Sequence, residues 1–438
     1  MIKNIVRIIT LSAVLGVFVF SGCEDRSNLT APTPPSTGNV SLSNFVTLGN
    51  SLTAGYQSGS LFQSAQQYSF GNQIAMTTGA AFTQPLCSDP GLGQRIEVAS
   101  VSPFALKYNS AQGQPININL PTPYNNLGVP GAFVYDILNT TATSNSYTAQ
   151  VGVMNPLFDV ILRGKGSEFQ QAKAQHPTLV SCWIGANDVL GYATSGGTNP
   201  ITDPLVFGYL YGKLADSLAS LNTKVVVATI PAVTAIPYFT TVPAALKDPA
   251  SGAIIKLYGQ TTTGVRALVP GQDLLTLTAS TVLLSSSGAP TGVGLSPNNP
   301  IPNKYVLDKD EVAKVANTVA AYNQVISGAA AAKGFALVDI YTIFNGIAAN
   351  GVKADGLYLT TAFGTGGLFS LDGVHPTSAG YGVVANAFIQ AVNAKFGGTI
   401  PSINVSTIPG SIVLNKSYKM SKYGIPIIPP GALDHVLF

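Results

Sequence analysis

Two short segments that lie far apart in the 438-residue chain carry a candidate nucleophile and a candidate base. Residues 49–52, Gly-Asn-Ser-Leu, follow the apolar run 45–48, which is typical of a buried strand, so Ser51 is expected where a strand turns toward a helix. Residues 372–376, Asp-Gly-Val-His-Pro, contain one of only three histidines. In that position His375 could take the proton of the Ser51 hydroxyl, as nucleophilic catalysis by serine requires.

Apolar runs that alternate with helical patterns indicate the elements that position these residues. Strands are expected at 45–48, just before Asn126, and at 179–184, 225–230 and 335–340. Helices are expected at 64–78, 168–174, 205–221, 309–332 and 377–394. This alternation predicts an α/β fold in which a parallel sheet of about five strands is covered by helices on both faces. Ligands bind at the carboxyl edge of such sheets, where Ser51 and Asn187 follow the first and third strands.

Two segments, about 80–125 and 235–305, are too long to be ordinary connections in this alternation. We interpret both as insertions on the active-site side of the domain, where loops carry specificity; the alternative is that they cover the surface. Residues 398–438 form a C-terminal extension without clear periodicity, and we assign it no function.

The N-terminus has the parts of a secretory signal: Lys3 and Arg7, the apolar run 8–20, and two small residues before Cys23. This pattern resembles a bacterial lipoprotein signal. The resemblance implies that residues 1–22 are removed and that Cys23 is lipidated, which places the protein at a membrane of the cell envelope, outside the cytoplasm, with the outer membrane as the expected one. The alternatives are an uncleaved anchor helix and an ordinary signal.

The composition agrees with export. Charged residues make up only 9% of the chain, against roughly 25% in ordinary soluble domains, and beyond residue 22 no apolar run approaches the roughly 18 residues needed to cross a bilayer. Residues 23–43 are rich in Pro, Ser and Thr, as expected of a linker that follows a lipid anchor. Loss of Lys3 and Arg7 would lower the formal charge from +3 to +1, so nothing here would attract nucleic acid.

Two cysteines remain in the mature region. Cys182 lies in an apolar run and is interpreted as a buried free thiol, whereas Cys87 lies in an irregular segment. Export would permit a disulfide between them, but the sequence does not bring them together. No spacing of Cys and His suggests a zinc site.

Four short blocks, in order along residues 45–395, resemble those of the SGNH hydrolases, also called the GDSL esterase/lipase family. The blocks are Gly-Asn-Ser-Leu at 49–52, Asn-Leu-Gly-Val-Pro-Gly at 126–131, Gly-Ala-Asn-Asp at 185–188 and Asp-Gly-Val-His-Pro at 372–376. The resemblance implies a flavodoxin-like three-layer α/β/α domain over residues 44–397. The pentapeptide G-x-S-x-G, which surrounds the nucleophile of α/β-hydrolases, is absent, because Thr53 occupies the position of its last glycine.

The resemblance also implies a role for each matched residue. Ser51 would attack an ester carbonyl, His375 would accept and return the proton, and Asp372 would orient the imidazole. The oxyanion would receive hydrogen bonds from the Ser51 N–H, the Asn187 side chain and a glycine of the second block. Either Gly128 or Gly131 could be that glycine, and the spacing from Asn126 favours Gly131. No metal or cofactor takes part.

Other residues near these blocks have less distinctive roles. Asn50 replaces the usual Asp of the first block but keeps a carbonyl acceptor, so activity should survive. Asp188 is expected to brace its loop, Trp183 to pack in the core because it lies within a strand, and His176 to be structural. Tyr56 could line a pocket.

These observations predict a lipid-anchored serine esterase or lipase that acts through an acyl-enzyme. The substrate could be an acyl lipid, an aryl ester or an acetylated sugar. One alternative is a catalytically silent surface lipoprotein that binds glycan or lipid, since a fold does not guarantee its chemistry. Another is an acyltransferase, which would use the same residues.

Overall fold

The computed structural model describes residues 39–408 and 420–428. The predicted signal segment 1–22, Cys23 and most of the linker 23–43 therefore lie outside the described residues. Within the described ranges, no helix is both long enough and apolar enough to cross a bilayer.

The centre of the fold is a parallel sheet formed by four short strands. The strands are β1 (Phe45–Gly49), β6 (Leu179–Trp183), β7 (Lys224–Ala228) and β14 (Ala336–Val338), and they lie in the order β1-β6-β7-β14. All five residues of β1 and of β6 are buried, which agrees with the continuous apolar runs from which these strands were predicted.

The expected strand before Asn126 is reduced to a single parallel bridge between Asn126 and Thr47, on the free edge of β1. The Asn125 N–H donates to the Thr83 carbonyl, while the Asn125 carbonyl accepts the Thr47 N–H and the Leu127 N–H donates to the Thr47 carbonyl. In chain order the sheet therefore runs 2-1-3-4-5, the flavodoxin-like order. The prediction of a parallel α/β sheet is confirmed, with four strands and a bridge in place of five strands.

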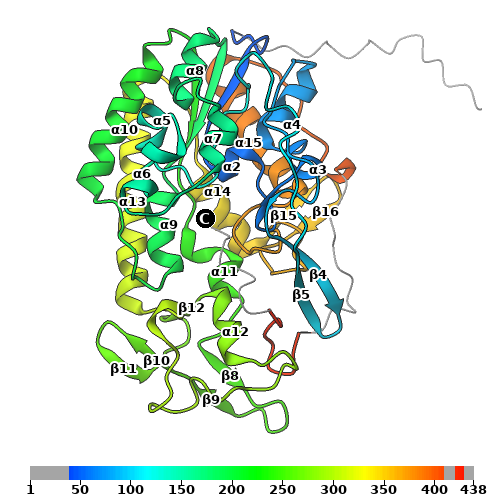
Figure 1. The fold of residues 1–438 in the computed structure, drawn as a ribbon, viewed down its shortest axis with the longest axis vertical. Coiled ribbons are helices and arrows are strands. Elements are labelled where there is room, and N and C mark those ends of the chain that lie inside the picture. The colour runs from blue at the N-terminus through cyan, green and yellow to red at the C-terminus, as the bar shows by residue number, and fades with distance from the viewer. Residues whose placement is uncertain (1–38, 409–419, 429–438) are drawn as a thin grey trace, which may run out of the picture. The chain divides into compact units, whose positions relative to one another are not determined.

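Helices cover both faces of the sheet, because alternate residues of each strand point to opposite sides. Val46, Val180 and Val225 belong to one core cluster, with α8 (Glu168–Ala174), α10 (Pro204–Ala219) and α13 (Lys309–Lys333). Phe45 and Val226 belong to another, with α4 (Phe70–Thr78) and α15 (Ser378–Phe396). Figure 1 shows α10 and α13 side by side on one face, and α4 and α15 on the other.

The five predicted helical segments are present: 168–174 has the predicted ends, and the ends of 205–221, 309–332 and 377–394 differ by one or two residues. The segment 64–78 is divided into α3 (Gln63–Gln66) and α4, because Ser69 caps a new helix. The longest, α13, has the full capping box of Asp308 and Glu311 and ends at Gly334. The helices not expected include α5 (Asp136–Asn139), α6 (Tyr147–Gln150), α7 (Leu157–Leu162), α9 (Asn187–Thr194) and α14 (Ile340–Asn350).

The segment 80–125 forms a β-hairpin of its own. β4 (Arg95–Val101) pairs with β5 (Phe104–Asn109), and the preceding β3 (Leu92–Gly93) pairs with β2 (Ser60–Leu61). Residues 420–428 add to this hairpin, since Ile427 exchanges backbone hydrogen bonds with Phe104 and Leu106. Residues 398–408 pack along α15.

The segment 235–305 contains two small hairpins and short helices. The hairpins are β8 (Ala245–Lys247) with β9 (Ile254–Lys256) and β10 (Tyr258–Thr261) with β11 (Gly264–Ala267). The helices are α11 (Pro237–Thr240) and α12 (Ser280–Leu283), and β12 (Leu274–Leu275) pairs with β13 (Val306–Leu307) just before α13.

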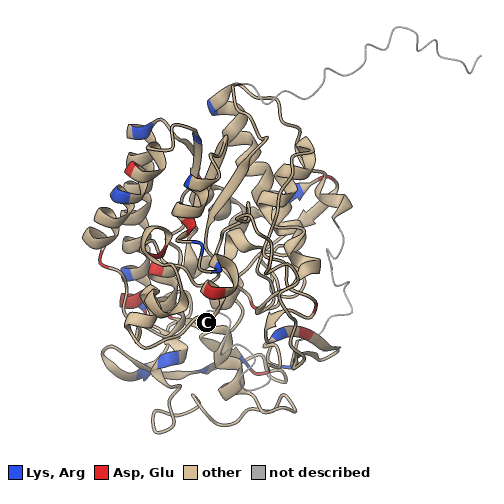
Figure 2. Ribbon diagram, turned by 45° about the horizontal axis from the view of Figure 1, so that its top comes forward, with Lys and Arg blue, Asp and Glu red and all other residues tan. Residues whose placement is uncertain are grey.

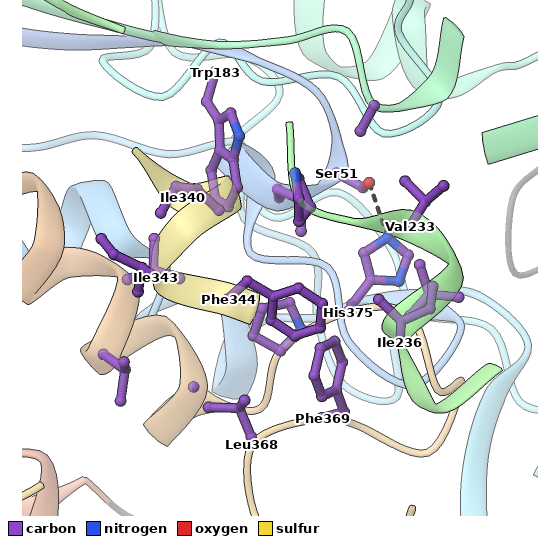
Figure 3. A pocket seen from close by; sticks show the side chains of 18 of the residues that line it. Ser51, Trp183, Val233, Ile236, Ile340, Ile343, Phe344, Leu368, Phe369 and His375 are labelled. Atoms are coloured by element: carbon purple, nitrogen blue, oxygen red, sulfur yellow. Dashed lines mark hydrogen bonds between the residues drawn. The ribbon is translucent and has the colours of Figure 1, made fainter. Parts of the chain in front are cut away.

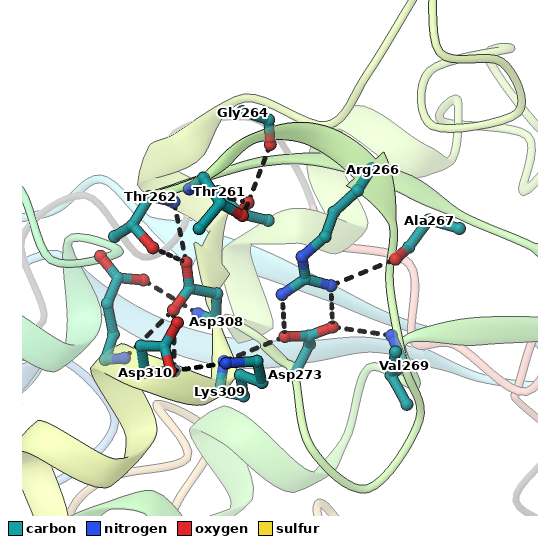
Figure 4. A network of polar contacts seen from close by, with 12 residues as sticks. Thr261, Thr262, Gly264, Arg266, Ala267, Val269, Asp273, Asp308, Lys309 and Asp310 are labelled. Carbon is teal, nitrogen blue, oxygen red and sulfur yellow. Dashed lines mark hydrogen bonds and ion pairs between the residues drawn. The ribbon is translucent and has the colours of Figure 1, made fainter.

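A polar network joins this segment to the first turn of α13 (Figure 4). The Arg266 guanidinium donates to both oxygens of Asp273, at 2.6 and 2.7 Å, and Asp273 also accepts the Lys309 N–H. The neighbouring Asp308 caps α13 and accepts hydrogen bonds from the backbone and hydroxyl of Thr262. The start of α13 is therefore held by side chains from the 235–305 segment.

The structure also locates the two cysteines and the few charges. Cys87 and Cys182 are both buried and free, which confirms the interpretation of Cys182. Burial raises the pKa of Cys87 to about 12 and that of Cys182 further, so both thiols are protonated and unreactive. Figure 2 shows Lys and Arg interspersed with Asp and Glu over the outer helices and the hairpins.

Candidate active site

Ser51 lies in the turn between the first strand and a short helix, as the apolar run before it predicts. β1 ends at Gly49, and Ser51 is the first residue of α2 (Ser51–Ala54). Position 49 requires glycine, because its φ is +147° and an added Cβ would lie 2.3 Å from the carbonyl oxygen of Trp183. As the first helical residue, Ser51 leaves its backbone N–H without a partner in the helix and therefore available to a ligand.

Asn50 performs the local task of capping α2. Its side-chain oxygen accepts the N–H of Leu52 at 3.1 Å, and the residue is buried. An amide oxygen caps a helix about as well as a carboxylate does. The substitution of Asn for the usual Asp therefore preserves the geometry of the nucleophile turn.

Ser51, His375 and Asp372 form a continuous hydrogen-bonded chain. The Ser51 hydroxyl lies 2.8 Å from Nε2 of His375, and Nδ1 of His375 lies 2.9 Å from a carboxylate oxygen of Asp372. The tautomer with its proton on Nδ1 satisfies both contacts: Nδ1–H donates to the carboxylate and Nε2 accepts the hydroxyl proton. The fold therefore brings the predicted nucleophile, base and orienting acid into contact.

Asp372 is fully buried yet remains an anion. Burial alone would raise the pKa of its carboxyl, but the attraction of His375 in its protonated form and hydrogen bonds from His375 and the Val374 backbone outweigh burial and hold the pKa below its ordinary value. The N–H of Gly59 adds a further hydrogen bond to the carboxylate. The acid is thus fixed by several donors independently of the imidazole.

Two tyrosines hold the nucleophile and the base together. The Tyr56 ring makes an edge contact with the His375 ring, at 4.9 Å between centroids, and is almost wholly buried. Tyr381 on α15 donates its hydroxyl to the backbone carbonyls of Tyr56 and Ser51. Tyr56 therefore packs against the base. His176 lies in the connection that enters β6 from the opposite edge of the sheet, away from the site.

The predicted oxyanion donors approach the same edge. Asn187 follows β6 as the first residue of α9, and its side-chain amide donates one hydrogen to the Ala132 carbonyl at 2.9 Å. Gly131 lies in the adjoining loop with a φ of +83°, and among the described residues its N–H has no acceptor. The Gly128 N–H is engaged by the Asn126 side chain at 3.2 Å. The structure thus leaves Gly131, and not Gly128, with a free donor.

Asp188 connects α9, which carries Asn187, to the loop that carries Gly131. Its carboxylate accepts the Val134 N–H at 3.0 Å and the Thr202 hydroxyl at 3.1 Å. Burial, opposed by these hydrogen bonds, raises the pKa of Asp188 to about 7. The expected bracing role of Asp188 is confirmed, and it reaches the loop that contains Gly131.

Glu168 supports the nucleophile turn from the other side, and sequence reasoning missed it. This first-turn residue of α8 is buried, and one of its carboxyl oxygens accepts the Gly49 N–H at 2.8 Å. Burial raises its pKa well above the ordinary value, and the hydrogen bond from the Gly49 N–H opposes this shift. Its sequence position carries no signal, because acidic residues in the first turn of a helix are usually exposed.

An apolar cavity of about 90 Å³ opens beside Ser51 and His375 (Figure 3). Asn187 and Asn50 also border it, and Trp183 lines it while packing against Phe388 in the core. The remaining wall is formed by side chains of α14 and α15, by the loop before α15, and by the segment after β7 that contains Val233 and Ile236. The predicted core role of Trp183 is thus confirmed, together with a second role in this cavity.

A second and larger cavity, of about 550 Å³, lies on the other side of Asn187. Gly131 borders it, as do Tyr238 and Tyr305 from the 235–305 segment and its end. Asn187 is the residue that the two cavities share. The 235–305 segment therefore contributes directly to the surroundings of the candidate catalytic residues.

The chain is similar to several solved structures and to one family model. No curated protein sequence matches the chain. Among solved structures, the acetylxylan esterase Axe2 from Geobacillus stearothermophilus is 13% identical, with a TM-score of 0.36 over 81% of this chain and 96% of its own. LAE5, an α/β hydrolase enzyme from the metagenome of Lake Arreo, Spain, is also 13% identical, with a TM-score of 0.35 over 81% and 97%.

A family model identifies the family to which the chain belongs. The model of the GDSL-like lipase/acylhydrolases matches residues 45–388, a span that begins at the strand before Ser51 and ends in the helix after His375. All four sequence blocks lie within this span. The protein is therefore a member of the GDSL-like lipase/acylhydrolase family.

Proposed function

We propose that this protein hydrolyses carboxylic esters by a serine mechanism in which Ser51 is the nucleophile, His375 the general base and Asp372 the residue that orients it. The chain of hydrogen bonds from Ser51 through His375 to Asp372, at 2.8 and 2.9 Å beside an apolar cavity, carries the proposal. A binding protein would not need this complete chain, and the resting distances already match those required for proton transfer.

In the acylation step the Ser51 oxygen forms a bond to the ester carbonyl carbon while its proton moves to Nε2 of His375. The resulting imidazolium is stabilised by the Asp372 carboxylate. When the tetrahedral intermediate collapses, the bond to the alcohol oxygen breaks and His375 gives its proton to the leaving alcohol. The acyl group remains on Ser51 as an ester.

The carbonyl oxygen becomes negatively charged in this intermediate and needs preorganised donors. The Ser51 N–H, the Gly131 N–H and the second amide hydrogen of Asn187 are the candidates, and each is free of other acceptors among the described residues. In the second step a water molecule gives a proton to His375 and attacks the acyl group. When the second tetrahedral intermediate collapses, the bond between the acyl carbon and the Ser51 oxygen breaks, His375 returns the proton to Ser51, and the carboxylic acid leaves.

Ser51→Ala tests this assignment. The variant removes only a hydroxyl, so the fold should be retained while p-nitrophenyl acetate turnover falls by at least about 10³-fold. Ser64→Ala, at a serine that bonds the exposed Asp89, is the matched control and should keep wild-type kcat. Unchanged turnover in the Ser51 variant, with circular dichroism intact, would refute the proposal.

A further inference from the structure

The apolar cavity is lined almost wholly by hydrocarbon side chains. Its polar groups, Asn50, Ser51, Asn187 and His375, lie at the catalytic end. The indole N–H of Trp183 is already donated to the Thr229 carbonyl, so this side chain presents no free donor to the cavity. Away from Ser51 the cavity therefore offers no hydrogen bond to a polar group and suits a hydrocarbon.

Two helices give this cavity its depth. One wall comes from Ile340, Ile343 and Phe344 on α14 (Figure 3). Another comes from Val384 and Ala387 on α15. Its volume of about 90 Å³ is several times the roughly 10–15 Å³ that one water molecule needs by the same kind of measure. An acetyl methyl group would fill only its entrance, whereas a chain of several methylenes would fill the rest.

The larger cavity has a different chemistry. Aromatic rings line it, among them Phe133 and Tyr147, whose centroids are 4.6 Å apart. Hydroxyl and amide groups of α9 and the loop that follows also line it, including those of Thr194 and Asn199. Flat amphipathic rings with neighbouring hydroxyl and amide groups suit a polyhydroxylated alcohol, which has both C–H faces and hydroxyls.

The two cavities meet where the scissile bond must lie. The apolar one contains Ser51 and His375, the larger one contains Gly131, and both are bordered by Asn187. A carbonyl carbon bonded to Ser51, with its oxygen on Asn187 and Gly131, would therefore have one cavity available to each of its two remaining substituents. Burial of hydrocarbon favours the acyl chain in the apolar cavity.

We infer that the substrate is an ester between a hydrocarbon acyl chain of several methylenes and a polyhydroxylated alcohol such as a sugar. The chain enters the cavity between α14 and α15, and the alcohol occupies the cavity beside the 235–305 segment. This inference rests on the proposed esterase function and adds the identity of both halves of the ester. An acetylated sugar, by contrast, would leave the apolar cavity empty.

The acyl half is tested by chain length, with p-nitrophenyl acetate and p-nitrophenyl octanoate as probes. Each buried methylene contributes about fourfold, so kcat/KM for octanoate should exceed that for acetate by at least about 10²-fold. Ala387→Phe and Val384→Phe fill the cavity and should each lower the octanoate-to-acetate ratio by at least about tenfold. Ala394→Phe, on the exposed side of α15, should leave that ratio unchanged.

The alcohol half is tested by comparing 6-O-octanoylglucose with methyl octanoate. An added Cβ at Gly191 on α9 meets no atom within 4 Å, so Gly191→Phe places its ring in the larger cavity without a backbone clash. The kcat/KM ratio of the glucose ester to the methyl ester should fall by at least about tenfold. Gly212→Phe, at a helical glycine on α10 with equally open space, should not change it.

The outcomes separate this inference from the proposed function. An octanoate-to-acetate ratio near one in the wild type, or a ratio that both cavity-filling variants leave unchanged, overturns the acyl half. If Gly191→Phe does not alter the ratio of kcat/KM for 6-O-octanoylglucose to kcat/KM for methyl octanoate, the alcohol half of the inference is overturned. In either case acetate hydrolysis that depends on Ser51 would leave the esterase proposal intact, whereas hydrolysis independent of Ser51 would refute that proposal instead.

Discussion

The Asn187 side chain is held in place by the protein itself. One of its two amide hydrogens is donated to the Ala132 carbonyl, which fixes the plane of the amide, and the other remains free. Donors that need no reorganisation when charge develops stabilise a transition state more than flexible ones do. The same contact joins Asn187 to the loop that carries Gly131, so two of the three candidate oxyanion donors are positioned as a unit.

Substitution of Asn187 should therefore lower kcat more than it raises KM. For Asn187→Ala we expect a fall of about 10²- to 10³-fold in kcat on p-nitrophenyl acetate. Asn187→Asp should be at least as damaging, because a carboxylate has no hydrogen to donate and would repel both the Ala132 carbonyl and the oxyanion. Steady-state kinetics measure both effects, with Asn317→Ala on the exposed face of α13 as control. An Asp variant with wild-type kcat would contradict the assignment.

Among the individual residues of the candidate active site, sequence reasoning identified those with distinctive chemistry and missed those that are distinguished only by burial. Ser51, His375 and Asp372 were found because serine, histidine and aspartate occur in spaced blocks. Glu168 was not found, because only its burial and its contact with Gly49 distinguish it from a surface acid. Such contacts join residues remote in the chain and leave no local pattern.

Among the elements, the boundary between β14 and α14 shows where periodicity failed. The apolar run 335–340 was interpreted as one strand, but β14 ends at Val338 and Asp339 caps a helix that begins at Ile340. The cap, with apolar residues at 340, 344 and 347 and Gly351 after the helix, was a usable signal. Because α14 forms a wall of the apolar cavity, missing this helix also meant missing the cavity.

The Arg266–Asp273 ion pair should contribute more to stability than the nearby Lys309–Asp310 ion pair at the start of α13. The Asp273 side chain is fully buried, and Arg266 is 28% exposed. Arg266→Ala would leave a buried carboxylate without its cation, and we expect the free energy of unfolding to fall by about 2 kcal/mol. The Lys309–Asp310 pair is more than half exposed on both sides, so Lys309→Ala should cost less than about 0.5 kcal/mol.

Urea denaturation followed by circular dichroism measures both changes in the unfolding free energy. Equal losses in the two variants would show that the buried Arg266–Asp273 pair adds no more to stability than the exposed Lys309–Asp310 pair. A loss confined to Arg266→Ala would support the view that this segment, which borders the larger cavity, is fixed by the network in Figure 4.

Across the whole molecule, several buried carboxyls have shifted pKa values in opposite directions. Burial raises the pKa of Asp188 and of Glu311 to about 7, and that of Glu168 well above its ordinary value. The pKa values of Asp372 and Asp273 are lowered, because hydrogen bonds and paired charges outweigh their burial. At a given pH the folded chain therefore binds a different number of protons from the unfolded chain.

These shifts predict a stability maximum in mild acid. Carboxyls with lowered pKa values stabilise the fold at pH values above 3.8, the ordinary pKa of an Asp carboxyl. That contribution is lost as the pH falls through the pKa values of the folded state. Groups with raised pKa values keep a proton that the unfolded chain has released, so stability falls between about pH 4 and 7. The melting temperature should therefore peak near pH 4 to 5.

Calorimetry from pH 3.5 to 8 tests this profile. Asp188→Asn, which cannot titrate, should reduce the decline above the maximum without moving the acid limb. A melting temperature that rises steadily to pH 8 would show that the buried carboxyls ionise freely in the folded protein.

The distance along the chain between nucleophile and base has a consequence for the timing of activity. Ser51 and His375 are 324 residues apart, and Gly131 and Asn187 both precede the 235–305 segment. At 5 to 20 residues per second, a ribosome needs roughly 15 to 65 s to pass from one to the other. Until His375 has been added, the growing chain contains Ser51 but not the base that activates it, so a nascent polypeptide, or one truncated before residue 375, should be inactive toward esters.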